Sequence, residues 1–282
     1  MQAVAYSDLT VGEKIGGGGV GLVHRGWYNR KPVALKVLFD ARMNEELIRE
    51  FTEEVNVLAQ LRHPNIVRVL GGSTSPPHLF FLMELCESSV YEELHIKRRR
   101  YGMQELLKIA LDTVYAMQYL HSQSPPVVHR DLKSHNLLIG ADGNTKLCDF
   151  GLVCTSSTTA GTPCYMAPEL LQNRPFTKSV DVYAFGILLW ELFSQDLPFR
   201  GLEVGDVKEV VTAGQRPTVP RGDTPRQIRD MMEQCWAQVP MERPTFGQCV
   251  PVLQELVQEH SSRSHVDDLD DFGGDSLDCL LK

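Results

Sequence analysis

Two patterns of hydrophobic and polar positions divide the chain. Before residue 85, short runs rich in β-branched residues alternate apolar and polar positions, with polar or glycine-rich turns between them. Alternation with a period of two is typical of half-buried strands. It predicts three antiparallel strands in the runs 9–15, 16–23 and 32–38, and two further strands after the turn at 63–67.

Helical spacing of apolar positions appears once in that region and dominates after it. Residues 45–61 and 104–121 each place apolar side chains three or four positions apart, as amphipathic helices do. The longest apolar run, 184–193, is much shorter than the ~20 residues that a membrane helix needs, and Glu191 interrupts it. It predicts a buried helix and no membrane span. A last helix is expected from Thr245 to about residue 259.

Length and charge narrow the class of protein. A chain of 282 residues is longer than one compact core usually organises, which predicts one large bilobal domain or two small ones. The net charge of −8 argues against nucleic acid as the main partner. From residue 261 onward six aspartates stand against two basic residues. This composition predicts an acidic, disordered tail over 261–282.

The cysteines and the first residues bear on the cellular compartment. Seven cysteines show neither paired metal-ligand spacing nor the density of a disulfide scaffold. The first nine residues lack the basic start and apolar centre of a signal peptide. We therefore expect reduced thiols in a cytoplasmic protein.

A glycine-rich stretch follows the first predicted strand. Gly16, Gly18, Gly21 and Val23 fit the spacing G-x-G-x-x-G-x-V, which lets a backbone approach phosphates but which a flexible turn also produces. In a dinucleotide-binding fold a helix follows such glycines, whereas here a strand follows and a third strand carries Lys36. The order favours a mobile phosphate-binding lid over a dinucleotide fold.

The densest group of reactive side chains lies at 129–136, with Asp149 following a short hairpin. Phosphoryl transfer needs a carboxylate for the hydroxyl proton, metal ligands beside the nucleotide phosphates, and cations near the transferring group. This stretch offers all three. Asp131 would be the base, Asn136 and Asp149 the Mg²⁺ ligands, and Lys133 the cation near the γ-phosphate.

Residues 129–136 and 149–151 resemble the catalytic loop and the metal-binding motif of eukaryotic protein kinases. The resemblance spans about 9–259. Leu-Lys-Ser-His-Asn at 132–136, with Cys-Trp at 235–236, resembles the tyrosine-kinase-like branch of serine/threonine kinases. It implies an α+β bilobal fold. The parts implied are a small antiparallel-sheet lobe with one regulatory helix (1–84), a hinge and larger, mostly helical lobe (85–260), and the tail (261–282).

The resemblance also implies how phosphates and metal are held. Lys36 would grip the α- and β-phosphates and would itself be held by Glu54, with Glu50 and Glu53 as competing choices. Such an ion pair depends on helix position, so it is a plausible switch. The cofactors implied are ATP and Mg²⁺, with Mn²⁺ as a substitute.

The stretch 83–86 resembles the hinge between the lobes, although a simple strand end would show the same residues. Backbone groups of Glu84 and Cys86 would bond adenine, and Met83 would limit the pocket behind it. The implied ATP-binding residues are Ile15, Gly16, Gly17, Gly18, Gly21, Val23, Ala34, Lys36, Glu54, Met83, Glu84, Cys86 and Leu138.

Residues 149–169 resemble an activation segment, which implies a regulatory phosphorylation. Thr162 would bridge Asp131 and Lys133. A phosphate on Thr158 or Thr159 would add about −1.5 to −2 charges, and Arg130 would receive it. The resemblance thus implies an upstream activating kinase.

Other residues are implied to support the site without reacting. His129 would pack beneath Phe150, and Asp181 would bond the backbone of the catalytic loop. Glu169 would pair with Arg243.

The reaction implied is transfer of the γ-phosphoryl group of ATP to Ser or Thr hydroxyls of protein substrates, in signal transduction. Two alternatives remain open: a pseudokinase scaffold that only binds, and a tyrosine or dual-specificity kinase. The basic run 97–100 is either a solvated face or a contact for the acidic tail.

Overall fold

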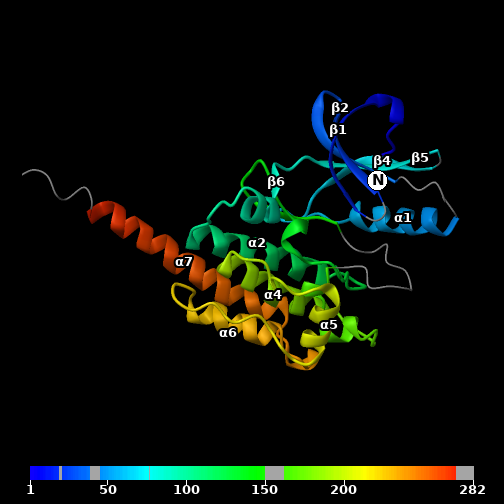
Figure 1. Ribbon diagram of the computed structural model, residues 1–282. Coiled ribbons are helices and arrows are strands. Elements are labelled where there is room, and N and C mark those ends of the chain that lie inside the picture. Colours follow the sequence, from blue (N-terminus) through cyan, green and yellow to red (C-terminus); the bar gives the residue numbers. More distant parts are fainter. Residues whose placement is uncertain (19–20, 39–44, 76, 150–161, 271–282) are drawn as a thin grey trace, which may run out of the picture.

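The computed structural model describes residues 1–18, 21–38, 45–75, 77–149 and 162–270 (Figure 1). In helix α1 the side chains of residues 45–47, 50, 53 and 54, and in helix α7 those of 263–270, are outside this description. Figure 1 shows the sheet of the first part above a helical body formed by the rest of the chain. This arrangement is the two-lobed α+β fold that the sequence predicted.

The small lobe is built on a five-stranded sheet in the order β1-β2-β3-β5-β4, and every neighbouring pair is antiparallel. Gly16 to Gly18 complete β1 rather than opening the second strand, because each pairs with a residue of β2. The predicted strand at 16–23 therefore begins later, at Gly21. The strands are β1 (Leu9–Gly18), β2 (Gly21–Tyr28), β3 (Lys31–Val37), β4 (Val69–Ser75) and β5 (His78–Glu84).

The two faces of this sheet are covered differently. One face packs on helix α1 (Glu45–Leu58), where the rings of Phe51 and Phe81 lie 5.9 Å apart. On the other face, buried residues of β3 and β5 pack with Val4 of the N-terminal segment. Helix α1 ends at Leu58, three residues before the predicted end, because the backbone tightens there into i→i+3 hydrogen bonds from Gln60 and Leu61.

The large lobe consists mainly of helices around one that is largely apolar. Helix α4 is buried along most of its length, as the run 184–193 predicted. Within the described residues, no helix joins the length and the apolar character that a bilayer crossing demands. The helices are α2 (Met103–His121), α3 (Pro168–Leu171), α4 (Ser179–Ser194), α5 (Val204–Thr212), α6 (Arg226–Cys235) and α7 (Phe246–Asp270).

Helix α7 continues well past residue 259, where the sequence predicted its end. The expected disordered tail is thus helical as far as Asp270, and the expectation for 271–282 concerns residues outside the description. Neither glycine nor proline occurs between 252 and 272, so nothing local stops the helix. The Ser262 hydroxyl also donates to the Gln258 carbonyl one turn earlier, at 2.9 Å.

Short elements between the lobes carry the candidate site. A three-stranded sheet contains β6 (Ser88–Ser89), β7 (Leu137–Ile139) and β8 (Thr145–Leu147). Single turns of helix are at Glu92–Ile96, Ser134–Asn136 and Pro163–Tyr165. One hydrophobic cluster runs from α1 through these elements to α7, so the two lobes share a core.

Candidate active site

The catalytic loop is fastened to the buried helix α4 by one carboxylate. Asp181 accepts hydrogen bonds from the backbone N–H groups of His129 (2.9 Å) and Arg130 (2.8 Å), and His121 Nε2 lies 2.8 Å from the same carboxylate. The Asp181 side chain is buried. The expected bond between Asp181 and the loop backbone is therefore present, and it fixes the loop immediately before Asp131.

Two polar side chains of the loop converge on Asp131. Lys133 Nζ lies 2.8 Å from Asp131 Oδ2, and Asn136 Nδ2 donates to the same oxygen at 3.0 Å. Lys133 also donates to the Thr162 hydroxyl at 3.2 Å. Thr162 was expected to bridge Asp131 and Lys133. Among the described residues it bonds Lys133 and makes no bond to Asp131.

Asp149 meets Lys36 across the two lobes. Lys36 Nζ on β3 donates to Asp149 Oδ1 at 2.6 Å, and the Asp149 side chain is 51% exposed. Burial by itself would raise the pKa of Asp149, but the ammonium of Lys36 outweighs it and holds that pKa below its ordinary value. The carboxylate is therefore ionised and reachable. The expected partner Glu54 lies in α1, and its side chain is outside the described residues.

The backbone is in the left-handed region at two positions of this site, with φ of 67° at Arg130 and 50° at Asp149. Side chains other than glycine rarely adopt such angles, and the surroundings must hold them. At Arg130 the Asp181 bond does so.

His129 is a neutral, buried residue. The N–H of Asp131 donates to its Nδ1 (3.2 Å), while Nε2 lies 3.0 Å from the Cys148 carbonyl oxygen, which can only accept. One nitrogen accepts and the other donates, as in a neutral imidazole. Burial lowers the pKa of His129 accordingly. This pattern fits the structural role expected for it; its expected neighbour Phe150 is outside the described residues.

Strands β1, β2 and β5 carry residues that are expected to form the roof and the hinge of a nucleotide cleft. Gly16 pairs with Val23, and a side chain at Gly21 would meet the Val37 carbonyl oxygen at 2.6 Å. At the expected hinge, the Glu84 N–H donates to the Arg68 carbonyl (3.0 Å), and the adenine bonds of Glu84 and Cys86 stay a prediction. Ile15 and Ala34 belong to the strands above, and Leu138 lies on β7 below.

Behind Met83 there is almost no free space. A cavity of about 10 Å³ lies between Met83, Leu58, Cys148 and Asp149, and one water needs at least that much. Burial, followed by nearby carboxylates, raises the pKa of the Cys86 thiol to about 12, and burial also raises the pKa of Cys148. Both thiols are therefore poor nucleophiles.

The expected ion pair of the large lobe is present. Arg243 donates two hydrogen bonds to Glu169, at 2.6 and 2.9 Å, and both side chains are buried. Arg130 lies over the ring of Phe176, 5.2 Å from its centre, and its buried Nε has no hydrogen-bond partner among the described residues. Thr158 and Thr159 are outside the described residues.

Comparison with known proteins decides the family. A sequence model of the family described as "protein tyrosine and serine/threonine kinase" matches residues 9–253. The chain belongs to the protein kinase family. Members of this family use ATP and a divalent metal ion, and they act on proteins.

Three relatives of this kinase chain illustrate the match. It is 39% identical to serine/threonine-protein kinase CTR1 and 36% identical to serine/threonine-protein kinase STY17, both of Arabidopsis thaliana. It is 35% identical to the probable serine/threonine-protein kinase drkA of Dictyostelium discoideum. The matches cover 90%, 91% and 88% of this chain but 32%, 46% and 40% of the relatives. CTR1 and STY17 belong to the tyrosine-kinase-like branch, as the motifs predicted.

The residues of this kinase fit a magnesium ion with few protein ligands. Asn136 gives its Nδ2 to Asp131, so its Oδ1 is the end that can face a cation, and Asp149 supplies an ionised carboxylate. Mg²⁺ is commonly held by one or two carboxylates plus phosphates and waters. No group of three or more His, Cys, Asp or Glu that could hold a metal occurs among the described residues.

Sequence reasoning missed a buried network beneath the kinase's catalytic loop. The Glu191 carboxylate accepts from Ser134 Oγ (2.6 Å) and Tyr165 Oη (2.7 Å), and His95 Nε2 lies 2.8 Å away. The side chain of Glu191 is fully buried. The signal was present, because a carboxylate that interrupts an apolar run needs buried partners, but nothing local identified them.

Proposed function

We propose that this kinase domain transfers the γ-phosphoryl group of ATP to Ser and Thr hydroxyls of protein substrates. The observation that carries the proposal is the grouping of Asp131, Lys133 and Asn136 on one loop, opposite the Lys36–Asp149 pair. A pseudokinase would need none of these contacts. The names of CTR1 and STY17 support Ser/Thr specificity.

Each side chain has a part in the reaction that follows from its contacts. Asp131 Oδ2 is held by Lys133 and Asn136, so it meets a substrate hydroxyl in a fixed orientation and takes its proton. Lys133 reaches both Asp131 and Thr162, which places its charge where the transferring group passes. Such fixed positioning accounts for most of the rate in phosphoryl transfer.

Lys36 and the glycine loop hold the nucleotide. Lys36, which bonds Asp149, would hold the α- and β-phosphates of ATP, and the backbone N–H groups of Gly16, Gly17, Gly18 and Gly21 would cover them. Asn136 and Asp149 would hold Mg²⁺ or Mn²⁺, which would supply positive charge beside the phosphates.

The proposal extends to the regulation of the kinase through Arg130 and to its cellular location. Arg130 carries a buried Nε without a described partner, and a phosphate on Thr158 or Thr159 would give it one. We infer activation by an upstream kinase that phosphorylates these residues, in a cytoplasmic signalling protein with protein rather than nucleic acid partners.

The test combines purified protein, Mg²⁺, labelled ATP and a generic protein substrate, with Lys36→Met and Asp149→Asn alongside. We expect label on Ser or Thr and a loss on the order of 10²-fold or more in each variant, since each removes a preorganised charge. No label from folded protein treated with activating kinases would favour the scaffold alternative. Label on Tyr alone would favour a tyrosine kinase.

A further inference from the structure

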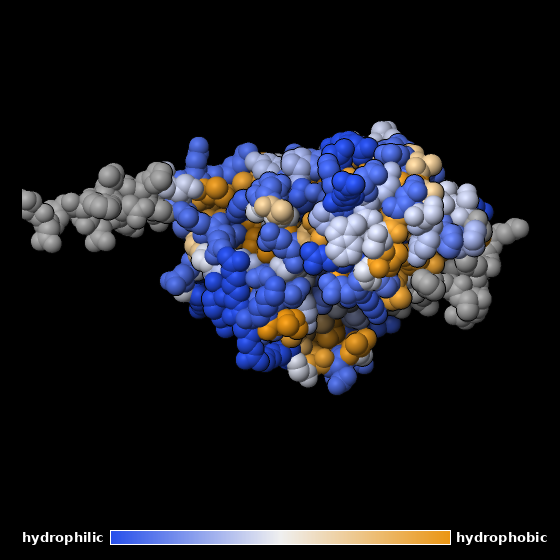
Figure 2. All heavy atoms as spheres, turned by 90° about the horizontal axis from the view of Figure 1, so that it is seen from above, coloured by the Kyte–Doolittle hydropathy of each residue, from blue (hydrophilic) through white to orange (hydrophobic). Residues whose placement is uncertain are grey.

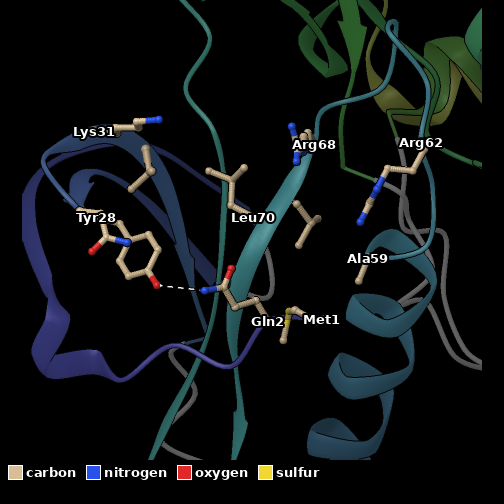
Figure 3. A pocket seen from close by; sticks show the side chains of 11 residues that line it. Met1, Gln2, Tyr28, Lys31, Ala59, Arg62, Arg68 and Leu70 are labelled. Atoms are coloured by element: carbon tan, nitrogen blue, oxygen red, sulfur yellow. Dashed lines mark hydrogen bonds between the residues drawn. The ribbon is translucent and has the colours of Figure 1, made fainter.

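A cavity of about 410 Å³ opens on the small lobe and shares no residue with the ATP-binding set (Figure 3). Its walls come from four separate segments: the N-terminal residues, the turn into β3, the start of β4, and the link from α1 to β4. The lining residues are Met1, Gln2, Tyr28, Asn29, Lys31, Val33, Ala59, Arg62, Arg68, Val69 and Leu70.

Three cations and no acid line this cavity. They are Lys31 at the start of β3, Arg62 after α1, and Arg68 before β4. In Figure 3 the Arg62 guanidinium is directed toward the cavity from the side of α1, while Lys31 and Arg68 lie along its upper margin.

The charges of this triad are uncompensated within the described residues, where no carboxylate oxygen lies within 4 Å of their cationic groups. The nearby Glu84 accepts the backbone N–H of Arg68 (2.8 Å), and its other oxygen lies 3.3 Å from Lys146. The chain holds 36 acidic against 28 basic Lys and Arg residues. Three neighbouring cations without an acid are therefore a departure from its composition.

The other basic cluster of the chain behaves differently. In the run 97–100, Lys97 pairs with Glu92 and Glu93, and Arg99 Nη2 lies 2.5 Å from Glu105. Within the described residues Lys97 and Arg99 thus have acidic partners, whereas Arg98 and Arg100 have none, and the contact with the acidic tail stays a prediction. The triad has no carboxylate partner in the described residues, where Arg62 Nη1 donates to the carbonyl of the neighbouring Leu61 at 2.9 Å.

The rest of the cavity supplies an apolar wall and a neutral polar edge. Val33, Ala59 and Val69 are apolar, and Gln2 donates to the Tyr28 hydroxyl at 3.4 Å, so that hydroxyl can donate in turn. The lining thus suits a ligand with one strongly anionic end and a short apolar body.

We propose that this cavity binds a phosphoserine or phosphothreonine side chain of a peptide segment with apolar neighbours. A phosphate monoester carries about −1.5 to −2 charges and three acceptor oxygens, and the planar guanidinium groups of arginine suit it. A concave site on a chain of net charge −8 fits a single phosphate better than an anionic membrane surface. The inference rests on the proposed function only for the source of the phosphate.

Bound phosphate would connect parts of the small lobe that matter for catalysis. Arg62 follows α1, which carries Glu54, and Lys31 begins β3, which carries Lys36. A ligand held by both joins the end of the helix to the strand. Phosphorylated protein could in this way anchor itself on the kinase and bias the position of α1.

The test measures binding of a fluorescent hexapeptide, with phosphothreonine between two leucines, to the full chain by anisotropy. We expect binding that the unphosphorylated twin lacks, and a loss of about tenfold in affinity for Arg62→Gln and for Arg68→Gln, as removal of a bond to a charged group implies. Arg221→Gln, an exposed arginine of the large lobe, is the matched control and should bind as the wild type does.

Equal binding of both peptides would overturn the proposal, and so would phosphopeptide binding that neither variant weakens, which would place the peptide elsewhere. If the protein bound phosphoinositide vesicles more tightly than the phosphopeptide, and if this binding required Arg62, the ligand of the cavity would be a membrane and not a peptide. If either arginine variant fails to fold, Lys31→Gln, an exposed side chain, makes the same test. The assay needs no turnover, so its failure leaves the proposed function standing.

Discussion

At the scale of single residues, Asp181 shows how a group that never reacts can control the chemistry. Its two oxygens are shared among two backbone N–H groups and His121. Because the Arg130 backbone is in the left-handed region, the loop would relax without these bonds, and Asp131 would move with it.

We predict that Asp181→Asn lowers the free energy of unfolding by about 1–3 kcal/mol, since an amide N–H would face a backbone donor. The rate should fall on the order of 10²-fold through misplacement of Asp131. Urea unfolding and single-turnover kinetics measure the two effects. Asp230→Asn, an exposed aspartate that pairs only with Arg226, is the control. Wild-type kinetics in Asp181→Asn would show that the catalytic loop keeps its conformation without the Asp181 bonds.

Buried His129 gives the fold a pH dependence whose sign is fixed. Its pKa in the folded protein is below the ordinary 6.5, mainly through burial. As pH falls below 6.5, His129 is protonated in the unfolded chain but stays neutral in the folded protein. The free energy of unfolding therefore decreases.

We predict that His129→Asn reduces the loss of stability between pH 7 and pH 5. Thermal unfolding across this range makes the comparison, with the exposed His78→Asn as control. His63 and His135 also have a lowered pKa through burial, so the loss should shrink rather than vanish. An unchanged pH profile in His129→Asn would contradict the assignment.

At the scale of elements, α4 connects three separate elements of the large lobe through Glu191. The network joins the catalytic loop, the turn at Pro163–Tyr165, and the turn at Glu92–Ile96. A buried carboxylate depends on every partner it has.

We predict that Tyr165→Phe destabilises the fold by about 1–2 kcal/mol and raises KM for protein substrate more than KM for ATP. The reason is that Tyr165 belongs to the end of the segment 149–169, which resembles an activation segment, and not to the glycine stretch or the β3 strand that are proposed to hold ATP. Tyr115→Phe loses only an exposed bond with Gln254 and serves as the matched control. Equal changes in both KM values would point to general loosening.

The strand pair β2–β3 leaves no room at Gly21. A methyl group there would meet the Val37 carbonyl, whereas at Gly17 it would meet the flexible ends of Leu22 and Lys14 at 3.2 and 3.3 Å.

We therefore predict that Gly21→Ala separates the two strands, costs about 1–3 kcal/mol of stability, and weakens ATP binding severalfold. Gly17→Ala should do neither to the same degree. Calorimetric titration with ATP and Mg²⁺ compares the variants. The same affinity in both would mean that the loop adjusts freely.

The elements show which parts of the fold a sequence can predict. Strands, α2 and α4 followed from local periodicity, and the residues of the cleft followed from motifs. Gly16 to Gly18 were placed in the wrong strand because glycines carry no pattern of faces. The partners of Glu191 and the Lys31–Arg62–Arg68 triad come from distant segments, and only tertiary folding brings them together.

At the scale of the whole molecule, one hydrophobic cluster joins α1 to the large lobe. We predict that both lobes unfold together. Hydrogen exchange across a urea series should give the same midpoint for peptides from β5 and α4. A lower urea midpoint for β5 than for α4 would show that the small lobe unfolds on its own.

The Lys36–Asp149 bond described above also sets the terms on which nucleotide enters. These two charges bond one another, so ATP that binds Lys36 through its phosphates replaces one favourable bond with another. The measured affinity then reports only the difference between the two. The phosphates of ATP compete with the Asp149 carboxylate for the Lys36 ammonium. A high dissociation constant for ATP is therefore compatible with strong contacts between Lys36 and the bound phosphates.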